Sequence, residues 1–305
     1  MKPLFILTLL GILTAVLVLP PGPSFGERID RGVVQSEALK EASGLAASRR
    51  NPGILWTHND SGDESRVFAI DENGRKKGIF TLSGITARDW EDIAVGPGPE
   101  AGRSYLYLAD IGDNLAVFDL KYIHRIPEPV VDTLQAPRNT TLDGAETLTF
   151  RYPDGRFDAE TLMVDPATGD LYVITKRDTT VTVYHAPFPQ PTDRIFDLQP
   201  LTTLTFSLVP GLNGGGQGAV AGDIAPSGLE VLVKTYDKVY YWSRPDLSAP
   251  LFATTSVQVP YVREPQGEAV AWAADGGGYY TISEAWHSLP VHLYFYPRLP
   301  DERDR

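Results

Sequence analysis

Short runs of β-forming residues alternate with turn residues along most of the chain. Runs such as ILWTH (54–58) and YLYLA (105–109) are rich in aliphatic and aromatic residues, and each ends in a polar turn. The turns include NPG, DPATG, PSG and DGGG, which suit hairpins. After the N-terminal segment, no apolar period of 3.6 residues reaches helical length. The pattern predicts an all-β fold.

The same order of segments recurs five times. Each unit has a small-residue strand, usually with an acid, then a turn, a β-rich strand, a polar loop, an aromatic-rich strand and an outer strand. The units begin with EASGLAAS (41–48), DWEDIAVG (89–96), DAETLMVDP (158–166), VAGDIAPSG (220–228) and QGEAVAWAAD (266–275). Propeller blades of four strands occupy about 40–50 residues. We therefore predict a single β-propeller with five four-stranded blades. Six blades are the alternative, and a β-sandwich is less favoured because it requires no regular repeat.

The ends of the chain are expected to close the propeller. The last unit lacks an outer strand, and IDRGVVQSE (29–37) belongs to no unit. We expect this segment to complete the last blade, because that removes an exposed sheet edge. Two Pro-rich insertions, 128–144 and 187–200, are expected to be loops. The propeller domain is predicted over 29–299, with a flexible tail at 300–305.

Residues 1–28 are typical of an export signal. Lys2 precedes an uncharged run from Leu4 to Leu19, and a Pro-, Gly- and Ser-rich stretch follows. The run is short for a membrane span of about 20 residues. We expect an exported protein, periplasmic or extracellular, that contacts a membrane only through this segment. The segment is predicted to be a signal peptide or an N-terminal membrane anchor.

Composition restricts the partners. The net charge of −12 argues against nucleic acid, whose phosphates would be repelled. The chain has no cysteine, so an exported protein would depend on core burial or bound ions for stability. No helical interface stripe or coiled coil is evident, and a monomer is expected.

Oxygen-bearing side chains are predicted to gather at one face. In a blade, the innermost strand begins where the second strand ends, so residues from both places meet. Several carboxylates in one channel repel each other unless a cation neutralises them, and Ca²⁺ prefers such ligands. The predicted Ca²⁺ ligands are Glu41, Asn59, Asp60, Asp92, Asp110, Asp113, Asn114 and Asp223.

Basic and aromatic residues are expected on the same rim, where they would bind a small anionic molecule or a glycan. The predicted ligand-binding residues are Lys176, Arg177, Lys234, Tyr236, Glu284 and Trp286. Paired carboxylates would suit acid–base chemistry. The catalytic candidates are His58, Asp92, Glu160, Glu268 and His287. The nucleophile motif G-x-S-x-G and the zinc motif H-E-x-x-H are both absent.

The segments EASGLAAS, WTHNDSG, DWEDIA, LYLADIGDN and DAETL resemble those of exported bacterial β-propeller proteins of largely unknown function. More loosely, SGLA and GEAVA are similar to phrases in esterase-like phytase and gluconolactonase-type calcium propellers. That resemblance implies a top-face Ca²⁺ that polarises a phosphoester or lactone. It casts Glu41, Asp92, Glu160, Asp223 and Glu268 as metal or acid–base candidates, with Lys176 and Lys234 on the anion. The chain departs from those families in having five units where six are usual.

Three functions remain open at this stage. The first is a Ca²⁺-dependent hydrolase of a small anionic ester, phosphoester or lactone. The second is a non-catalytic propeller that binds a ligand or glycan at the cell surface. The third is a carboxylate-based glycan hydrolase or lyase. Propellers serve many functions, so the fold alone does not decide among them.

Overall fold

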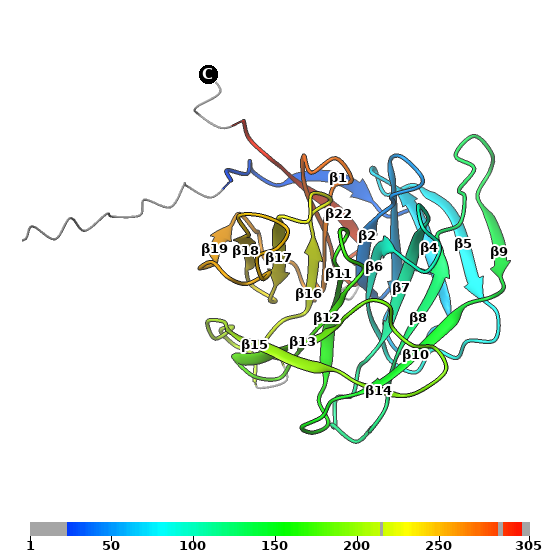
Figure 1. Cartoon of the computed structure of the whole chain (residues 1–305). Helices are drawn as coiled ribbons and strands as arrows, with labels where there is room; N and C mark the ends of the chain where they lie inside the picture. The colour runs from blue at the N-terminus through cyan, green and yellow to red at the C-terminus, as the bar shows by residue number, and fades with distance from the viewer. Residues whose placement is uncertain (1–22, 214–215, 286–288, 301–305) are drawn as a thin grey trace, which may run out of the picture.

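The computed structural model describes residues 23–213, 216–285 and 289–300. In these segments, the regular secondary structure consists of β-strands, β1 to β22. The strands form five sheets, which are set around a common axis like the blades of a propeller (Figure 1). Within these residues, no helix is long and apolar enough to cross a membrane. The predicted all-β propeller is confirmed, with five blades.

Blades 1 and 2, numbered along the chain, have five strands each. From the axis outwards, blade 1 consists of β2 (Ala42–Ala47), β3 (Ile54–Asn59), β4 (Arg66–Asp71), β5 (Lys76–Leu82) and β9 (Arg138–Leu142). Blade 2 consists of β6 (Trp90–Pro97), β7 (Ser104–Asp110), β8 (Lys121–Pro127), β10 (Glu146–Arg151) and β14 (Phe196–Asp197).

The remaining blades have four strands each. Blade 3 consists of β11 (Ala159–Val164), β12 (Leu171–Thr175), β13 (Thr180–Ala186) and β15 (Gln199–Thr205). Blade 4 consists of β16 (Ala221–Ile224), β17 (Glu230–Lys234), β18 (Val239–Ser243) and β19 (Val257–Val259). Blade 5 consists of β20 (Ala269–Trp272), β21 (Gly278–Ile282), β22 (His292–Pro297) and β1 (Ile29–Val33).

The N-terminal strand completes blade 5, as predicted. β1 pairs antiparallel with β22, and its register places Ile29 opposite Phe295 and Val33 opposite His292. Figure 1 shows β1 and β22 side by side. The innermost strands contact one another in the order β2, β6, β11, β16, β20 and back to β2. The ring of blades is therefore closed by pairing of the two ends of the chain.

The two insertions are not simply loops, so that expectation was wrong. Part of 128–144 forms β9, which pairs in parallel with β5 from Gly78 opposite Arg138 to Leu82 opposite Leu142. Part of 187–200 forms β14, which pairs in parallel with β10. Each insertion covers the outer edge of a blade, which reduces the exposed length of unpaired backbone.

The hydrophobic core is divided among the spaces between blades. One cluster joins blades 1 and 2 through Trp56 and Leu108, and another joins blades 2 and 3 through Tyr107 and Leu162. Three further clusters fill the remaining spaces. Because each blade packs on both of its faces, all six residues of β2 are buried and the strand shows no polar alternation.

Small residues allow the innermost strands to approach one another. A Cβ added at Gly44 would lie 2.6 Å from the backbone nitrogen of Ile93 in the next blade, and one at Gly96 would lie 2.3 Å from Val164 Cγ1. Neither distance leaves room for a side chain. The glycines of the repeated small-residue strands are therefore explained by crowding at the axis.

Ordered contacts begin before residue 29, where the domain was predicted to start. The backbone nitrogen of Gly26 donates to Pro297 O at 2.7 Å. The ring of Phe25, 7% exposed, packs edge-on against Tyr279 with the centroids 4.9 Å apart. Residues 1–22 of the predicted signal and residues 301–305 of the predicted tail lie outside the described residues.

Replacing Phe25 should weaken the closure of blade 5. We expect Phe25→Ala to lower the free energy of unfolding by about 3–5 kcal/mol, because it removes a buried aromatic ring. The measurement is urea unfolding followed by tryptophan fluorescence. Leu134→Ala is the control, since Leu134 is 96% exposed, and a change within about 0.5 kcal/mol is expected there. Equal effects of the two substitutions would contradict the role given to Phe25.

Candidate functional site

Acidic side chains from three blades meet at one end of the central channel. We call this end, where the innermost strands begin, the top mouth. Asp89 and Glu91 stand at the start of β6, and Glu268 stands just before β20. Asp60 follows β3 and Glu284 follows β21, so the second-strand ends reach the same place. The predicted meeting of these two sets of residues is present in the structure.

These carboxylates form two groups that share one residue. Ligand oxygens of Asp60, Asp89 and Glu91 lie within 4.8 Å of one another, and so do those of Asp60, Glu268 and Glu284. We call the five residues the carboxylate cluster. At such distances their negative charges repel strongly unless protons or a cation neutralise them.

A glycine makes space for part of the carboxylate cluster. A Cβ added at Gly112, in the segment DIGDN, would lie 2.1 Å from Glu91 Oε1 and 2.4 Å from Asp89 Oδ2. Any side chain at this position would displace the two carboxylates. The glycine after β7 therefore serves the cluster by its small size, while the acids around it have other partners.

Burial and mutual repulsion raise the pKa values in the carboxylate cluster. Burial raises the pKa of Asp60 to about 7, and the nearby charges of Glu268 and Asp89 add to the effect. Burial and the charge of Glu268 raise the pKa of Glu284 to about 8. Burial, then the charges of Glu160 and Asp60, raise the pKa of Glu91 well above its ordinary value. Without a cation, part of the cluster is protonated at neutral pH.

Blade 3 supplies two positive charges at the top mouth. Lys176 forms an ion pair with Glu160 and donates to Tyr236 Oη at 3.2 Å. Tyr236 in turn donates to a carboxylate oxygen of Glu268. Arg177 pairs with Asp158 and also donates to Asn114. The top mouth thus has a carboxylate side and a basic side, joined through Tyr236.

Glu160 has an oxygen with no partner. Its side chain is 7% exposed, and Oε1 pairs with Lys176. The other oxygen, Oε2, is buried and accepts no hydrogen bond in the described structure. Burial raises the pKa of Glu160 to about 8, against the opposing charge of Lys176. An unsatisfied buried oxygen beside a carboxylate cluster is consistent with a site that takes a cation or a ligand group.

A cavity of about 540 Å³ opens beside the carboxylate cluster. Tyr236 and Gln266 line the cavity and also form hydrogen bonds with the carboxylate cluster. Tyr236 donates to Glu268, and Gln266 Nε2 donates to Glu284 Oε2 at 2.5 Å. The charged residues of this wall are Arg263 and Glu264. A ligand in the cavity would therefore lie between a guanidinium group and the carboxylates.

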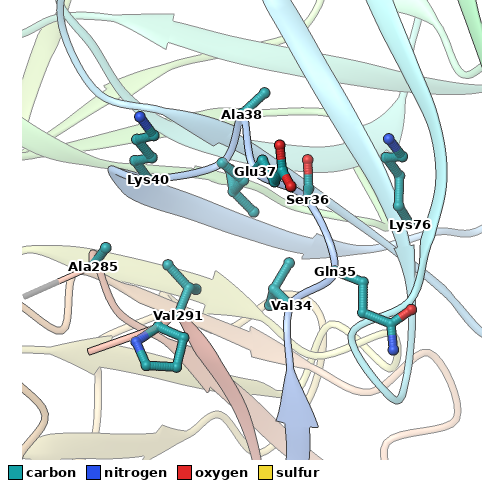
Figure 2. A pocket seen from close by; sticks show the side chains of 11 residues that line it. Val34, Gln35, Ser36, Glu37, Ala38, Lys40, Lys76, Ala285 and Val291 are labelled. Atoms are coloured by element: carbon teal, nitrogen blue, oxygen red, sulfur yellow. The ribbon is translucent and has the colours of Figure 1, made fainter. Parts of the chain in front are cut away.

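A second cavity, of about 710 Å³, lies at the seam between blades 5 and 1. Figure 2 shows it between the connector 34–40, with Val34, Ser36 and Lys40, and the segment that carries Ala285 and Val291. None of the predicted site residues lines this cavity. It is a lateral feature of the blade junction and is separate from the carboxylate cluster.

Two of the predicted metal ligands serve the packing of innermost strands. The carboxylate of Asp92 accepts hydrogen bonds from the backbone nitrogens of Ile93 and of Leu162 in blade 3, both at 2.9 Å. Asp223 accepts from the backbone nitrogen of Trp272 in blade 5 at 2.8 Å. These bonds join neighbouring blades, so both acids have a structural task.

The polar residues that follow β3 and β7 mostly stabilise their own loops. Asn59 accepts from the backbone nitrogens of Lys40 and Glu41 at 2.9 and 3.0 Å. Asp110 accepts from the backbone nitrogens of residues 88 and 89, both at 3.0 Å. Asp113 accepts from two loop amides and from Lys121 Nζ at 2.8 Å. Their oxygens are already engaged within the fold, which disfavours a ligand role for them.

The other predicted residues are dispersed. His58 is fully buried against Trp90, and burial lowers its pKa to about 4, so the ring is neutral. Lys234 is also fully buried and donates to Gly267 O. Glu41 and Asn114 are exposed. Trp286 and His287 lie outside the described residues.

Asp89 and Glu91 lie in the segment DWEDIAVG, which the sequence placed at this face, but neither was chosen as a ligand. Gly112 and Arg263 were not predicted. Alternation along the strand does not separate Glu91 from Asp92, because the pairing of β6 with β7 shifts register between Trp90 and Asp92. Gly112 and Arg263 lie in loops, and no periodicity in the sequence places them.

No model of a protein family matches the chain, and no curated protein matches it. Two solved structures align with most of it. The WD40 repeats of RRP9 give a TM-score of 0.46 at 10% identity, covering 91% of this chain and 99% of that one. A structure of U3-55K gives 0.44 at 10% identity, covering 90% and 100%. At this level of similarity, the strand pairings and not these alignments identify the fold.

The stability contribution of Asp223 should depend on pH. Burial raises its pKa from 3.8 to about 6. A raised folded-state pKa means that the folded protein holds this proton more tightly than the unfolded chain. The contribution is therefore complete below pH 3.8 and is lost as the pH rises through about 6.

Asp223→Asn removes this titration and leaves a side-chain oxygen for Trp272. We expect the free energy of unfolding of the variant, minus that of the natural protein, to increase between pH 4 and pH 7 by up to about 3 kcal/mol. Urea unfolding of both proteins across this range measures the difference. A difference that does not change with pH, or that decreases, would contradict the assignment.

Proposed function

We propose that the top mouth is a Ca²⁺ site, and that the protein is an exported hydrolase of a small anionic ester, phosphoester or lactone. The observation that carries this proposal is the arrangement of two three-carboxylate groups around Asp60, beside a cavity whose wall includes Arg263. The net charge of −12 makes nucleic acid an unsuitable partner.

The residues fit a calcium ion by chemistry and by space. Ca²⁺ is bound by several oxygen ligands, mostly carboxylates and carbonyls. The carboxylate cluster supplies five such side chains, and Gly112 keeps the space beside Glu91 and Asp89 free. Asp60 would hold the ion together with either Asp89 and Glu91 or Glu268 and Glu284. A bound Ca²⁺ would supply Lewis-acid polarisation of a phosphoryl or carbonyl oxygen.

The remaining groups suit a hydrolytic reaction. Arg263 lies in the cavity wall, where it would bind the anionic part of the substrate. Tyr236 would orient the bound molecule through its hydroxyl group, which already contacts Glu268. Glu160 has a free Oε2 beside Lys176, and we assign to it the transfer of a proton between water and the leaving group.

The second candidate is a non-catalytic propeller that binds a ligand or glycan at the cell surface. Tyr236 favours it, because an aromatic ring in a cavity wall suits stacking on a sugar. The hydrolase requires both the Ca²⁺ site and turnover, whereas the binding propeller requires neither. They are therefore separated by activity measurements once metal binding has been tested.

Calcium should stabilise the protein through Asp60. At a concentration of 100 times its dissociation constant, Ca²⁺ should add about 2.7 kcal/mol to the free energy of unfolding, and EDTA should remove that gain. Asp60→Asn should lose this response. The same substitution should raise the stability of the metal-free protein, because it removes the carboxylate shared by both groups.

Thermal melts with EDTA and with added Ca²⁺ measure both effects. Asp193→Asn is the matched control, since that side chain is 81% exposed in a loop of blade 3, and it should retain the full response. If Ca²⁺ does not shift the melt of the natural protein, or if Asp60→Asn keeps the shift, the metal site is refuted.

Glu160→Gln should separate chemistry from metal binding. We expect it to lower turnover by about 10²–10⁴-fold, as for loss of a general acid or base, while the Ca²⁺ shift in the melt remains. Hydrolysis of a panel of aryl esters, phosphomonoesters and lactones provides the assay. Turnover that survives EDTA contradicts the metal-dependent hydrolase. A Ca²⁺ shift without turnover on any substrate, together with a melt shifted by glycans, establishes the binding propeller instead.

A further inference from the structure

The opposite end of the central channel carries a cavity of its own, with a volume of about 770 Å³. We call this end, where the innermost strands finish, the bottom mouth. Its wall includes residues just after β2, β11, β16 and β20 and at both ends of the turn between β6 and β7. Every blade therefore contributes, through Arg49, Arg50, Arg103, Pro166, Pro226 and Ala274 among others.

The charge of this wall is positive. Three of its residues are arginines, and none of the residues that line the cavity is acidic. In a chain with a net charge of −12 this is a local reversal of sign. The carboxylate cluster lies at the top mouth, so the residues that line the two ends of the channel differ in the sign of their charge.

The arginines are incompletely paired. Arg49 Nη1 is buried and has no hydrogen-bond partner in the described structure. Arg50 Nη1 donates only to a backbone carbonyl, Glu128 O, at 3.2 Å. The salt bridges of the described residues include neither Arg49 nor Arg50. Arg103 pairs with Glu100 at 2.8 Å, but both side chains are more than 40% exposed, so that pair contributes little.

Other arginines of the chain show what a completed pairing looks like. Arg244, which follows β18, donates to Asp165 Oδ2 at 2.8 Å and to the backbone carbonyl of Gly228 while buried. The acid whose charge acts on Arg49 is Asp223, and its Oδ2 already accepts from the backbone of Trp272. A buried guanidinium nitrogen without an acceptor costs free energy, which an incoming oxyanion would recover.

We propose that the bottom mouth binds a small ligand through its phosphate or carboxylate groups. The guanidinium fork matches the paired oxygens of both anions. Arg49 provides the inner contact, and Arg50 and Arg103 provide the outer ones. The site is independent of the carboxylate cluster, because it lies at the other end of the innermost strands.

Calorimetric titration of the full chain with pyrophosphate and with citrate tests the site, in buffer of low ionic strength without Ca²⁺. At least one of the two anions should bind, and Arg49→Gln should weaken its binding by at least tenfold. Arg50→Gln should weaken it by a smaller factor. Tighter binding of pyrophosphate identifies a phosphate ligand, and tighter binding of citrate identifies a carboxylate ligand.

Three further variants keep the test independent of folding and of the top mouth. Ala274→Glu leaves all three arginines in place and introduces a negative charge in the same wall, so it should also weaken binding at least tenfold. Arg194→Gln removes an arginine that is 71% exposed outside the cavity and should leave the affinity for the anions unchanged. Asp60→Asn, at the top mouth, should also leave it unchanged. The proposal is overturned if neither anion binds at millimolar concentration, or if Arg49→Gln and Ala274→Glu bind as well as the natural protein.

Discussion

The close approach of five innermost strands around one axis is the constraint on which the rest of the structure depends. The strands contact in a closed ring, and Gly44 and Gly96 leave no room for a side chain between neighbours. A polar side chain on such a strand has only two satisfactory positions. It can accept hydrogen bonds from the backbone of the adjacent blade, as Asp92 and Asp223 do, or it can reach one of the mouths, where water, an ion or a ligand is accessible.

The same constraint concentrates charge. Acidic residues at the starts of β6 and β20 and after β3 and β21 meet at the top mouth, so their carboxylates become neighbours although they are far apart in the sequence. The turns after the innermost strands converge at the bottom mouth, where arginines from blades 1 and 2 meet. Repetition of one supersecondary unit around an axis thus turns single residues in each repeat into clusters, and this is how the fold builds sites without a dedicated motif.

The sequence was sufficient for the blades and insufficient for the details of the site. Hairpin turns and runs of β-forming residues can be recognised locally in the sequence. Because the fifth unit lacked an outer strand, the unassigned segment that forms β1 could be predicted to supply it. The strands β9 and β14 were missed because each pairs in parallel with a distant strand, which requires no turn signal nearby. The candidate ligands were predicted from residue type, without knowledge of the direction in which each side chain points. Glu91 and Asp92 are adjacent and similar, yet one faces the carboxylate cluster and the other accepts from Leu162. The pairing of β6 with β7 shifts register between Trp90 and Asp92, and the sequence contains no signal for that shift. For loop residues such as Asp113, whose oxygens are taken by Lys121 and loop amides, no periodicity gives the orientation.

Protonation connects the carboxylate cluster with the cation we propose for it. Burial and repulsion raise the pKa values of Asp60 and Glu284 to about 7 and about 8, so an ion that enters the cluster displaces protons as it binds. The bound ion would also weaken the electrostatic attraction between the carboxylates and the ammonium group of Lys176, because its positive charge offsets part of their negative charge. Lys176 is bound to Glu160 and, through Tyr236, to Glu268. Filling the carboxylate side would therefore loosen the basic side of the top mouth and make it easier for an anion to take the place of a carboxylate there.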